Sequence, residues 1–136
     1  MVNHDLTVAL SLQAPREIRH SLEARYAGAM ERSLLDDVTL LASEVVTNAV
    51  QHSGRPDGDP VTLESSVVDG VLRVEITDEG QGVIRLEPRA TDPPSGLGYV
   101  EILSDRWSSR LNDSFHVWFE IDVASHMTVY RRVAAG

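Results

Sequence analysis

Two alternating runs of residues, 61–68 and 71–78, constrain the fold of this chain more than any other feature. Successive side chains of a strand point to opposite faces, so every second residue shares a face. The apolar residues of the second run all fall on one face: Leu72, Val74 and Ile76. Asp69 and Gly70 separate the runs, and an Asp-Gly pair favours a tight turn between antiparallel strands. The sequence therefore predicts a β-hairpin with one face turned toward a core.

Asp78 ends the second run and shares the parity of its apolar residues, so its carboxylate should face the core. Burying an unpaired carboxylate is costly. An amino group of a bound base is one donor that would pair with it, and a turn in which Asp78 caps its own backbone is the alternative. Gly80 and Gly82 follow in DEGQG. Glycines there permit positive φ and a close approach to a ligand, or simply form a turn.

The segment 34–51 has the periodicity of a helix that is buried along one face. Its apolar stripe recurs at intervals of three and four residues: Leu34, Val38, Leu41, Val45 and Ala49. Glu44, Asn48 and His52 are spaced four apart, so they should form a polar row on one face. A carboxylate and a carboxamide one turn apart can serve as a proton acceptor and as a ligand for a hard metal ion. The same row would also suit a solvent-facing helix surface.

The N-terminal part of the chain predicts one more strand and one more helix. Residues His4 to Gln13 alternate in the manner of a strand, and Pro15 is suited to begin a helix that extends to about Met30. The residues expected on the inner face of this helix are Ile18, Leu22, Tyr26 and Ala29.

The C-terminal part predicts a second hairpin, formed by residues 105–111 and 114–123 across Asn112 and Asp113. Strands and helices do not alternate regularly along the chain. The sequence therefore predicts an α+β two-layer sandwich, with a mostly antiparallel sheet and its helices on one face.

A glycine-containing segment, SGLG at residues 95–98, precedes a short apolar-periodic stretch that predicts a helix ending near Ser104. Free backbone N–H groups and the helix dipole favour phosphate at such a helix start. A plain loop-to-helix junction is the alternative.

In this order, the segments SEVVTNAVQHS, DEGQG and GLGYVEILSDRW resemble the N box and the two glycine boxes of the GHKL (Bergerat) ATPase superfamily. Together with the closing VWFEI, they look most like the small bacterial anti-sigma factor serine/threonine kinases and their histidine-kinase-like ATPase relatives. The resemblance extends from about Leu10 to Val123, and an ordered triplet is far more specific than one box.

The resemblance implies a role for each matching residue. Asn48 would hold Mg²⁺ at the triphosphate of ATP, and Glu44 would be the catalytic base. Asp78 would accept a hydrogen bond from the amino group of adenine. The other residues implied to bind the nucleotide are His52, Gly80, Gly82, Gly96, Leu97 and Gly98.

Two places depart from the family pattern. Residues 93–95 are Pro-Pro-Ser where the second glycine box often begins with an earlier glycine, and proline can donate no amide hydrogen to a phosphate. A threonine often found on the last strand also has no clear match, because Ser114, Phe115 and His116 stand there.

The function implied by the resemblance is that of an ATP-binding, anti-sigma-factor-like regulator. It would sequester a sigma factor and phosphorylate an anti-sigma antagonist protein on serine or threonine, using Mg²⁺. The alternative is a non-catalytic ATP-binding module of the same fold that acts by protein–protein binding alone. The resemblance also suggests a homodimer through the first strand and helix.

Composition sets the class of protein. A chain of 136 residues is expected to form one domain, over residues 1–123, with 124–136 as a C-terminal tail. The net charge of -9 argues against direct binding of nucleic acid, which requires clustered cations. All twelve basic residues are arginine, which excludes a P-loop because that motif needs a lysine.

The N-terminal segment lacks both a basic start and a long apolar run, so neither a signal peptide nor a membrane span is expected. The chain contains no cysteine, which is compatible with a cytoplasmic protein. We therefore expect a cytoplasmic protein that does not bind membranes.

Overall fold

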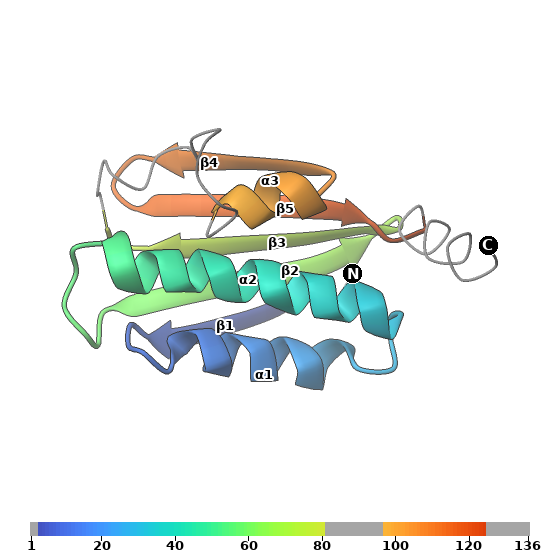
Figure 1. Ribbon diagram of the computed structural model, residues 1–136, viewed down its shortest axis with the longest axis horizontal. Coiled ribbons are helices and arrows are strands. Elements are labelled where there is room, and N and C mark those ends of the chain that lie inside the picture. Colours follow the sequence, from blue (N-terminus) through green and yellow to red (C-terminus); the bar gives the residue numbers. More distant parts are fainter. Residues whose placement is uncertain (1–2, 81–96, 125–136) are drawn as a thin grey trace.

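The computed structural model describes residues 3–80 and 97–124. Within these residues, five strands form one antiparallel sheet in the order β1-β2-β3-β5-β4, and three helices lie on one face of it (Figure 1). The elements are β1 (Asn3–Ala9), α1 (Ala14–Tyr26), α2 (Arg32–His52), β2 (Pro60–Val68), β3 (Val71–Asp78), α3 (Leu97–Leu103), β4 (Arg106–Leu111) and β5 (Phe115–Asp122). The predicted α+β two-layer sandwich is confirmed.

The hairpin of β2 and β3 has the turn that its sequence predicts. Asp69 has a φ of 52° and Gly70 a φ of 77°, so both central residues are left-handed, as a type I′ turn requires. The three apolar residues of β3 that share the inner face are at most 2% exposed. This register leaves Asp78 at the inner end of β3, between Val61 of β2 and Phe115 of β5.

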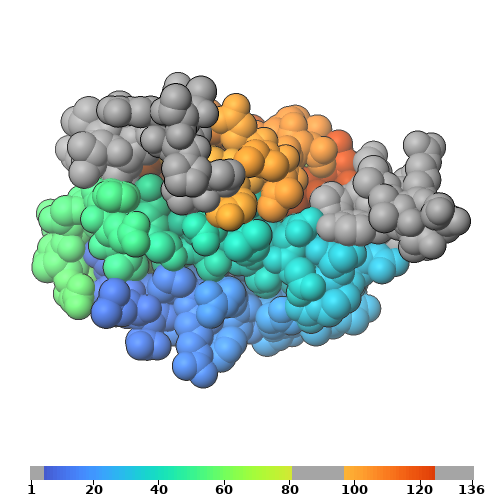
Figure 2. Space-filling view, viewed as in Figure 1, coloured from blue at the N-terminus to red at the C-terminus, as the bar shows by residue number. Residues whose placement is uncertain are grey.

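The central helix of the helical layer is α2. It packs against α1 and α3 and also contacts β3, and in the space-filling view it forms a band between α1 and α3 (Figure 2). The predicted apolar stripe is buried, and further residues of the helix are buried with it: Leu35, Thr39, Ala42, Ser43 and Val46. Because neighbours surround α2 on several sides, burial extends well beyond one stripe.

A buried hydrogen bond joins α1 to the sheet. Ser65 is a polar residue on the inner face of β2, where it is only 2% exposed. Its Oγ lies 2.8 Å from the hydroxyl oxygen of Tyr26, which ends α1 and is 3% exposed. Each hydroxyl therefore satisfies the other inside the core, as buried polar groups require.

The prediction that the first strand extends to Gln13 is wrong. The strand β1 ends at Ala9, and Leu10 is the last residue to pair, with its N–H donating to the carbonyl of Asp59 at 2.7 Å. Ser11 then accepts a hydrogen bond from the backbone of Gln13 at 3.1 Å and forms a turn. Leu12 continues the alternation of apolar residues in the sequence, but its side chain does not join the core, since it is 85% exposed.

The predicted end of the first helix at Met30 is also wrong, because α1 ends at Tyr26. Ala27 is extended, with a ψ of 129°, and Gly28 has a φ of 80°, which a right-handed helix cannot include. Ala29, expected on the inner face, is exposed. The second hairpin forms as predicted, with slightly shorter strands. Its first strand, β4, begins at Arg106 instead of residue 105, and β5 spans Phe115–Asp122 instead of 114–123, because the loop is Asn112 to Ser114.

None of the helices in the described ranges combines the length and the hydropathy needed to span a membrane.

Candidate functional site

The predicted polar row lies on α2. Glu44, Asn48 and His52 are all helical and all partly buried, and His52 is the last residue of the helix. One helical turn advances about 5.4 Å along the axis, so Glu44 and Asn48 lie about one turn apart on the same face of α2. Partial burial holds these side chains at the edge of the core.

Asp78 faces inward as its parity predicts, and it is only 4% exposed. Its Oδ1 accepts a hydrogen bond from the N–H of Gly80 at 2.7 Å. The alternative considered from the sequence, a carboxylate that caps its own turn, is therefore also present in the structure. The two interpretations are compatible, because the turn contact orients a carboxylate that already points into the molecule.

Gly80 is required at its position by the space around it. A Cβ added there would lie 2.6 Å from the Cβ and 2.7 Å from the Cα of Ser53, closer than real Cβ contacts. The φ of Gly80 is not positive, so of the two properties that a glycine permits, the conformational one is not used at this position. A close approach does occur, but the group that approaches Gly80 is the backbone of Ser53.

Ser53 was not among the residues that the sequence predicted for the site. It follows His52 directly as the C-cap of α2 and is 4% exposed. Its contact with Gly80 places the C-terminal end of α2 against the turn that orients Asp78. The one signal in the sequence is that Ser53 directly follows His52, a predicted site residue, and nothing in this segment indicates a contact with Gly80.

The third predicted segment is described only in part. Leu97 and Gly98 form the first turn of α3 and are both buried. The side chain of Leu97 belongs to the core, so a phosphate contact at this residue would have to use its backbone. Gly82 and Gly96 lie outside the described residues.

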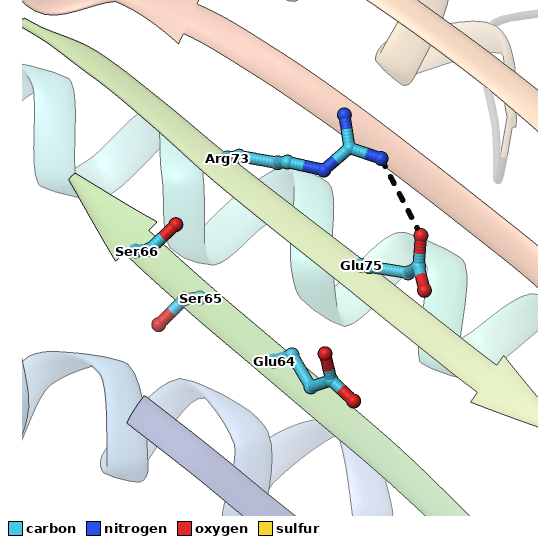
Figure 3. Close-up of a pocket in the computed structure, with 5 residues that line it drawn as sticks. All are labelled: Glu64, Ser65, Ser66, Arg73 and Glu75. Carbon is cyan, nitrogen blue, oxygen red and sulfur yellow. Dashed lines mark hydrogen bonds and ion pairs between the residues drawn. The ribbon is translucent and has the colours of Figure 1, made fainter. Parts of the chain in front are cut away.

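A separate hollow of about 130 Å³ lies on the opposite face of the sheet (Figure 3). It is lined by the outward-facing Glu64, Ser66, Arg73 and Glu75, together with Ser65, whose hydroxyl is bonded to Tyr26 in the core. In this view α2 lies behind the strands, so the sheet separates the hollow from the polar row. Arg73 forms ion pairs with Glu75 at 3.5 Å and Glu120 at 3.1 Å. The side chains on this face largely satisfy one another, as in an ordinary solvated sheet face.

The neighbouring strands of that outer face carry a second group of ion pairs. Arg106 donates to Glu120 at 2.7 Å and to Asp122 at 3.2 Å. Hydrogen bonding to Arg106 is the main cause that lowers the pKa of Glu120, and Arg73 lowers it further. The pKa of Asp122 is also lowered, mainly by its hydrogen bond with Arg106.

Residues 8–111 match the histidine kinase-like ATPase domain family. The chain belongs to this family. The matched range contains the polar row of α2, the turn at Asp78 and the whole of α3. The resemblance to histidine-kinase-like ATPases is thereby confirmed.

Individual relatives agree with this assignment. The anti-sigma F factor of Clostridium acetobutylicum is 35% identical over 87 residues, which cover 57% of this chain and 61% of the relative. The anti-sigma F factor of Halalkalibacterium halodurans is 36% identical over 76 residues, which cover 48% of this chain and 51% of the relative. In each case the chain spans less than two thirds of the relative.

Among solved structures, the Acinetobacter baumannii histidine kinase AdeS superposes with a TM-score of 0.51 at 16% sequence identity. The superposition covers 87% of this chain and 68% of AdeS. At that identity the likeness concerns the fold alone.

Proposed function

We propose that this protein is an ATP-binding regulator of the anti-sigma type, with serine/threonine kinase activity toward an anti-sigma antagonist protein. The observation that carries the proposal is the buried carboxylate of Asp78, held by Gly80 at the end of β3 in a histidine kinase-like ATPase domain. The similarity to two anti-sigma F factors supports the regulatory role. We place the protein in the cytoplasm, with residues 1–123 as its domain and 124–136 as a tail.

The surroundings of Asp78 suit the edge of an adenine base. Its register neighbours on the inner face, Val61 and Phe115, are apolar, so they offer the base no competing hydrogen bond. A carboxylate in that setting accepts a hydrogen bond from an exocyclic amino group, and its negative charge strengthens this bond. Asp78 would therefore select a base that carries an amino group at this edge.

The residues of α2 suit the other end of the nucleotide. The carboxamide oxygen of Asn48 is a hard ligand of the kind that Mg²⁺ prefers, and its partial burial leaves it able to reach a bound ion. Bound ATP would supply the phosphoryl group, and Mg²⁺ would offset the negative charge of the phosphates. His52 would contribute a polar contact beside Asn48, and Leu97 and Gly98 would contribute backbone N–H groups. Gly82 and Gly96 complete the proposed set.

Glu44 is the proposed general base. Its carboxylate would accept the proton of the attacking serine or threonine hydroxyl of the antagonist protein. A carboxylate is a weak base, so its effect depends on being held within hydrogen-bond reach of that proton. The fixed position of Glu44 one turn before Asn48 on α2 supports this assignment.

The proposed partners are a sigma factor and an anti-sigma antagonist protein, on the strength of the two similar anti-sigma F factors. We also propose a homodimer through the first strand and helix. In the described sheet, β1 is an edge strand, so one of its sides is open to pairing with another chain.

Calorimetric titration with ATP and Mg²⁺ tests the binding site. The protein should bind ATP, and Asp78→Asn should weaken the affinity about ten-fold or more, because a charge-assisted hydrogen bond is lost. The matched control is Asp69→Asn, which makes the same chemical change in an exposed turn and should leave binding unchanged. Absence of ATP binding, or equal binding by Asp78→Asn, would overturn the proposal.

A transfer assay with labelled ATP and an anti-sigma antagonist tests catalysis. Label should reach the antagonist, and Glu44→Ala should slow transfer about a hundred-fold, within the usual range for a general base. Glu64→Ala, on the opposite face of the sheet, is the control. Equal rates for Glu44→Ala and the wild type would disprove the role of Glu44.

The second candidate function is a non-catalytic ATP-binding module that regulates its partner by binding alone. It is favoured by the Pro-Pro-Ser sequence at residues 93–95, because proline provides no N–H for a phosphate. ATP binding without any transfer of label to the antagonist would support this second function.

A further inference from the structure

Gly80 contacts Ser53, a residue with no role assigned to it in the proposed nucleotide site. A Cβ added at Gly80 would lie too close not only to the Cβ and the Cα of Ser53 but also to its carbonyl oxygen, at 2.7 Å. Three atoms of Ser53, two of them backbone atoms, thus occupy the space that any side chain at residue 80 would need. The backbone of Gly80 lies directly against the end of α2.

Ser53 is itself held firmly. Its N–H donates to the carbonyl of Ala49 at 3.0 Å, and its Oγ accepts a hydrogen bond from the N–H of Arg55 at 3.2 Å. The loop that follows is anchored in turn, because the side chain of Arg55 donates to Asp59 at 2.6 Å. A side chain added at residue 80 would therefore displace the Gly80 turn more readily than Ser53.

The Gly80 turn also orients the carboxylate of Asp78, through the 2.7 Å hydrogen bond to Oδ1. Hydrogen bonds weaken steeply as they depart from linearity. A carboxylate that accepts a hydrogen bond from the amino group of a base must therefore keep its orientation. A displacement of Gly80 removes or tilts a bond that contributes to that orientation. A change at Ser53 therefore alters the orientation of Asp78 by way of Gly80.

We infer that Ser53 and Gly80 are positioning residues for Asp78, and that together they set the preference of the site for a purine base with a 6-amino group. This inference rests on the proposed binding of ATP. Neither residue is expected to touch the amino group. Their effect is to hold the one carboxylate that does.

The test compares ATP with purine riboside triphosphate, which lacks the 6-amino group, by calorimetry in the presence of Mg²⁺. The wild type should prefer ATP about ten-fold or more, the value of one charge-assisted hydrogen bond. Gly80→Ala should reduce this preference to near one while changing the affinity for purine riboside triphosphate by less than about three-fold. A purely structural defect would instead lower both affinities together.

Ser53→Gly provides a second variant, because it removes the Cβ that faces Gly80 and should lower the preference for ATP by slackening the turn. Combined with Gly80→Ala, it leaves two of the three clashing atoms in place, the Cα and the carbonyl oxygen of residue 53, so the double variant should lose no more of the preference than Gly80→Ala alone. The two effects should therefore not add, as expected for residues in direct contact. Ser53→Gly alone keeps the test valid if Gly80→Ala does not fold, which circular dichroism would reveal.

The matched control is Gly70→Ala, the same change at the other end of β3. Gly70 has a positive φ and no atom within 4 Å of an added Cβ, so this variant should lose stability without losing the preference for ATP.

Each outcome is decisive. Failure of the wild type to bind ATP overturns the proposed function. A wild-type preference that persists in folded Gly80→Ala, or effects of Ser53→Gly and Gly80→Ala that simply add, overturn the positioning role and leave ATP binding intact.

Discussion

The hydroxyl pair of Tyr26 and Ser65 provides a quantitative test of how α1 is held on the sheet. Both residues are at most 3% exposed, and their oxygens are 2.8 Å apart. Tyr26→Phe would leave the Ser65 hydroxyl buried without its partner, which costs about 1–3 kcal/mol. Ser65→Ala would likewise leave the Tyr26 hydroxyl buried without its partner, at a similar cost in the free energy of unfolding.

The double variant removes both hydroxyls, so no buried polar group loses its partner. Its free energy of unfolding should lie within about 1 kcal/mol of the wild-type value. The two single effects therefore should not add, and the coupling energy should be about 1 kcal/mol or more.

Urea unfolding followed by circular dichroism measures these differences. With a slope near 2 kcal/mol/M, a loss of 2 kcal/mol moves the midpoint by about 1 M. Ser66→Ala is the control, because the neighbouring serine lies on the outer face of β2 and should change stability by less than about 0.5 kcal/mol. A double variant as unstable as the sum of the single variants would refute the reasoning.

Two further predictions concern the sheet. Phe119→Ala should lower the free energy of unfolding by about 3–5 kcal/mol, because Phe119 is 0% exposed and its removal leaves a cavity; a loss below about 1 kcal/mol in urea unfolding would contradict this. Arg106→Gln should lower the thermal midpoint at pH 7, where Glu120 is charged and paired. Because the pKa of Glu120 is lowered from its usual 4.5, that stabilisation is lost as the pH falls through the lowered pKa. The difference between variant and wild type should therefore shrink in acid, and a constant difference from pH 7 to pH 3 would contradict the pairing.

The features that sequence predicts well here are governed by neighbouring residues. The hairpin at Asp69 and Gly70 follows from backbone preferences within the turn, and the polar row of α2 follows from helical periodicity. The burial of Asp78 also follows from its own strand, because parity is fixed by its apolar neighbours. Such features need no knowledge of distant parts of the chain.

The features that sequence missed depend on partners far away along the chain. The first strand ends at Ala9, and Leu10 makes the last hydrogen bonds of this segment, with Asp59 and Gly58, although the alternation continues to Leu12. The role of Gly80 depends on Ser53, which belongs to a different element. Periodicity describes one element at a time, so contacts of this kind are visible only in the folded chain.

The burial of α2 has a consequence for how this protein can evolve. The residues that hold the helix in the core lie outside the row of Glu44, Asn48 and His52. Replacement of Glu44 removes none of those buried side chains, so a natural variant that lacks this proposed base can keep the fold. Under the proposed function, descendants that act only by binding would be separated from kinases by very few substitutions.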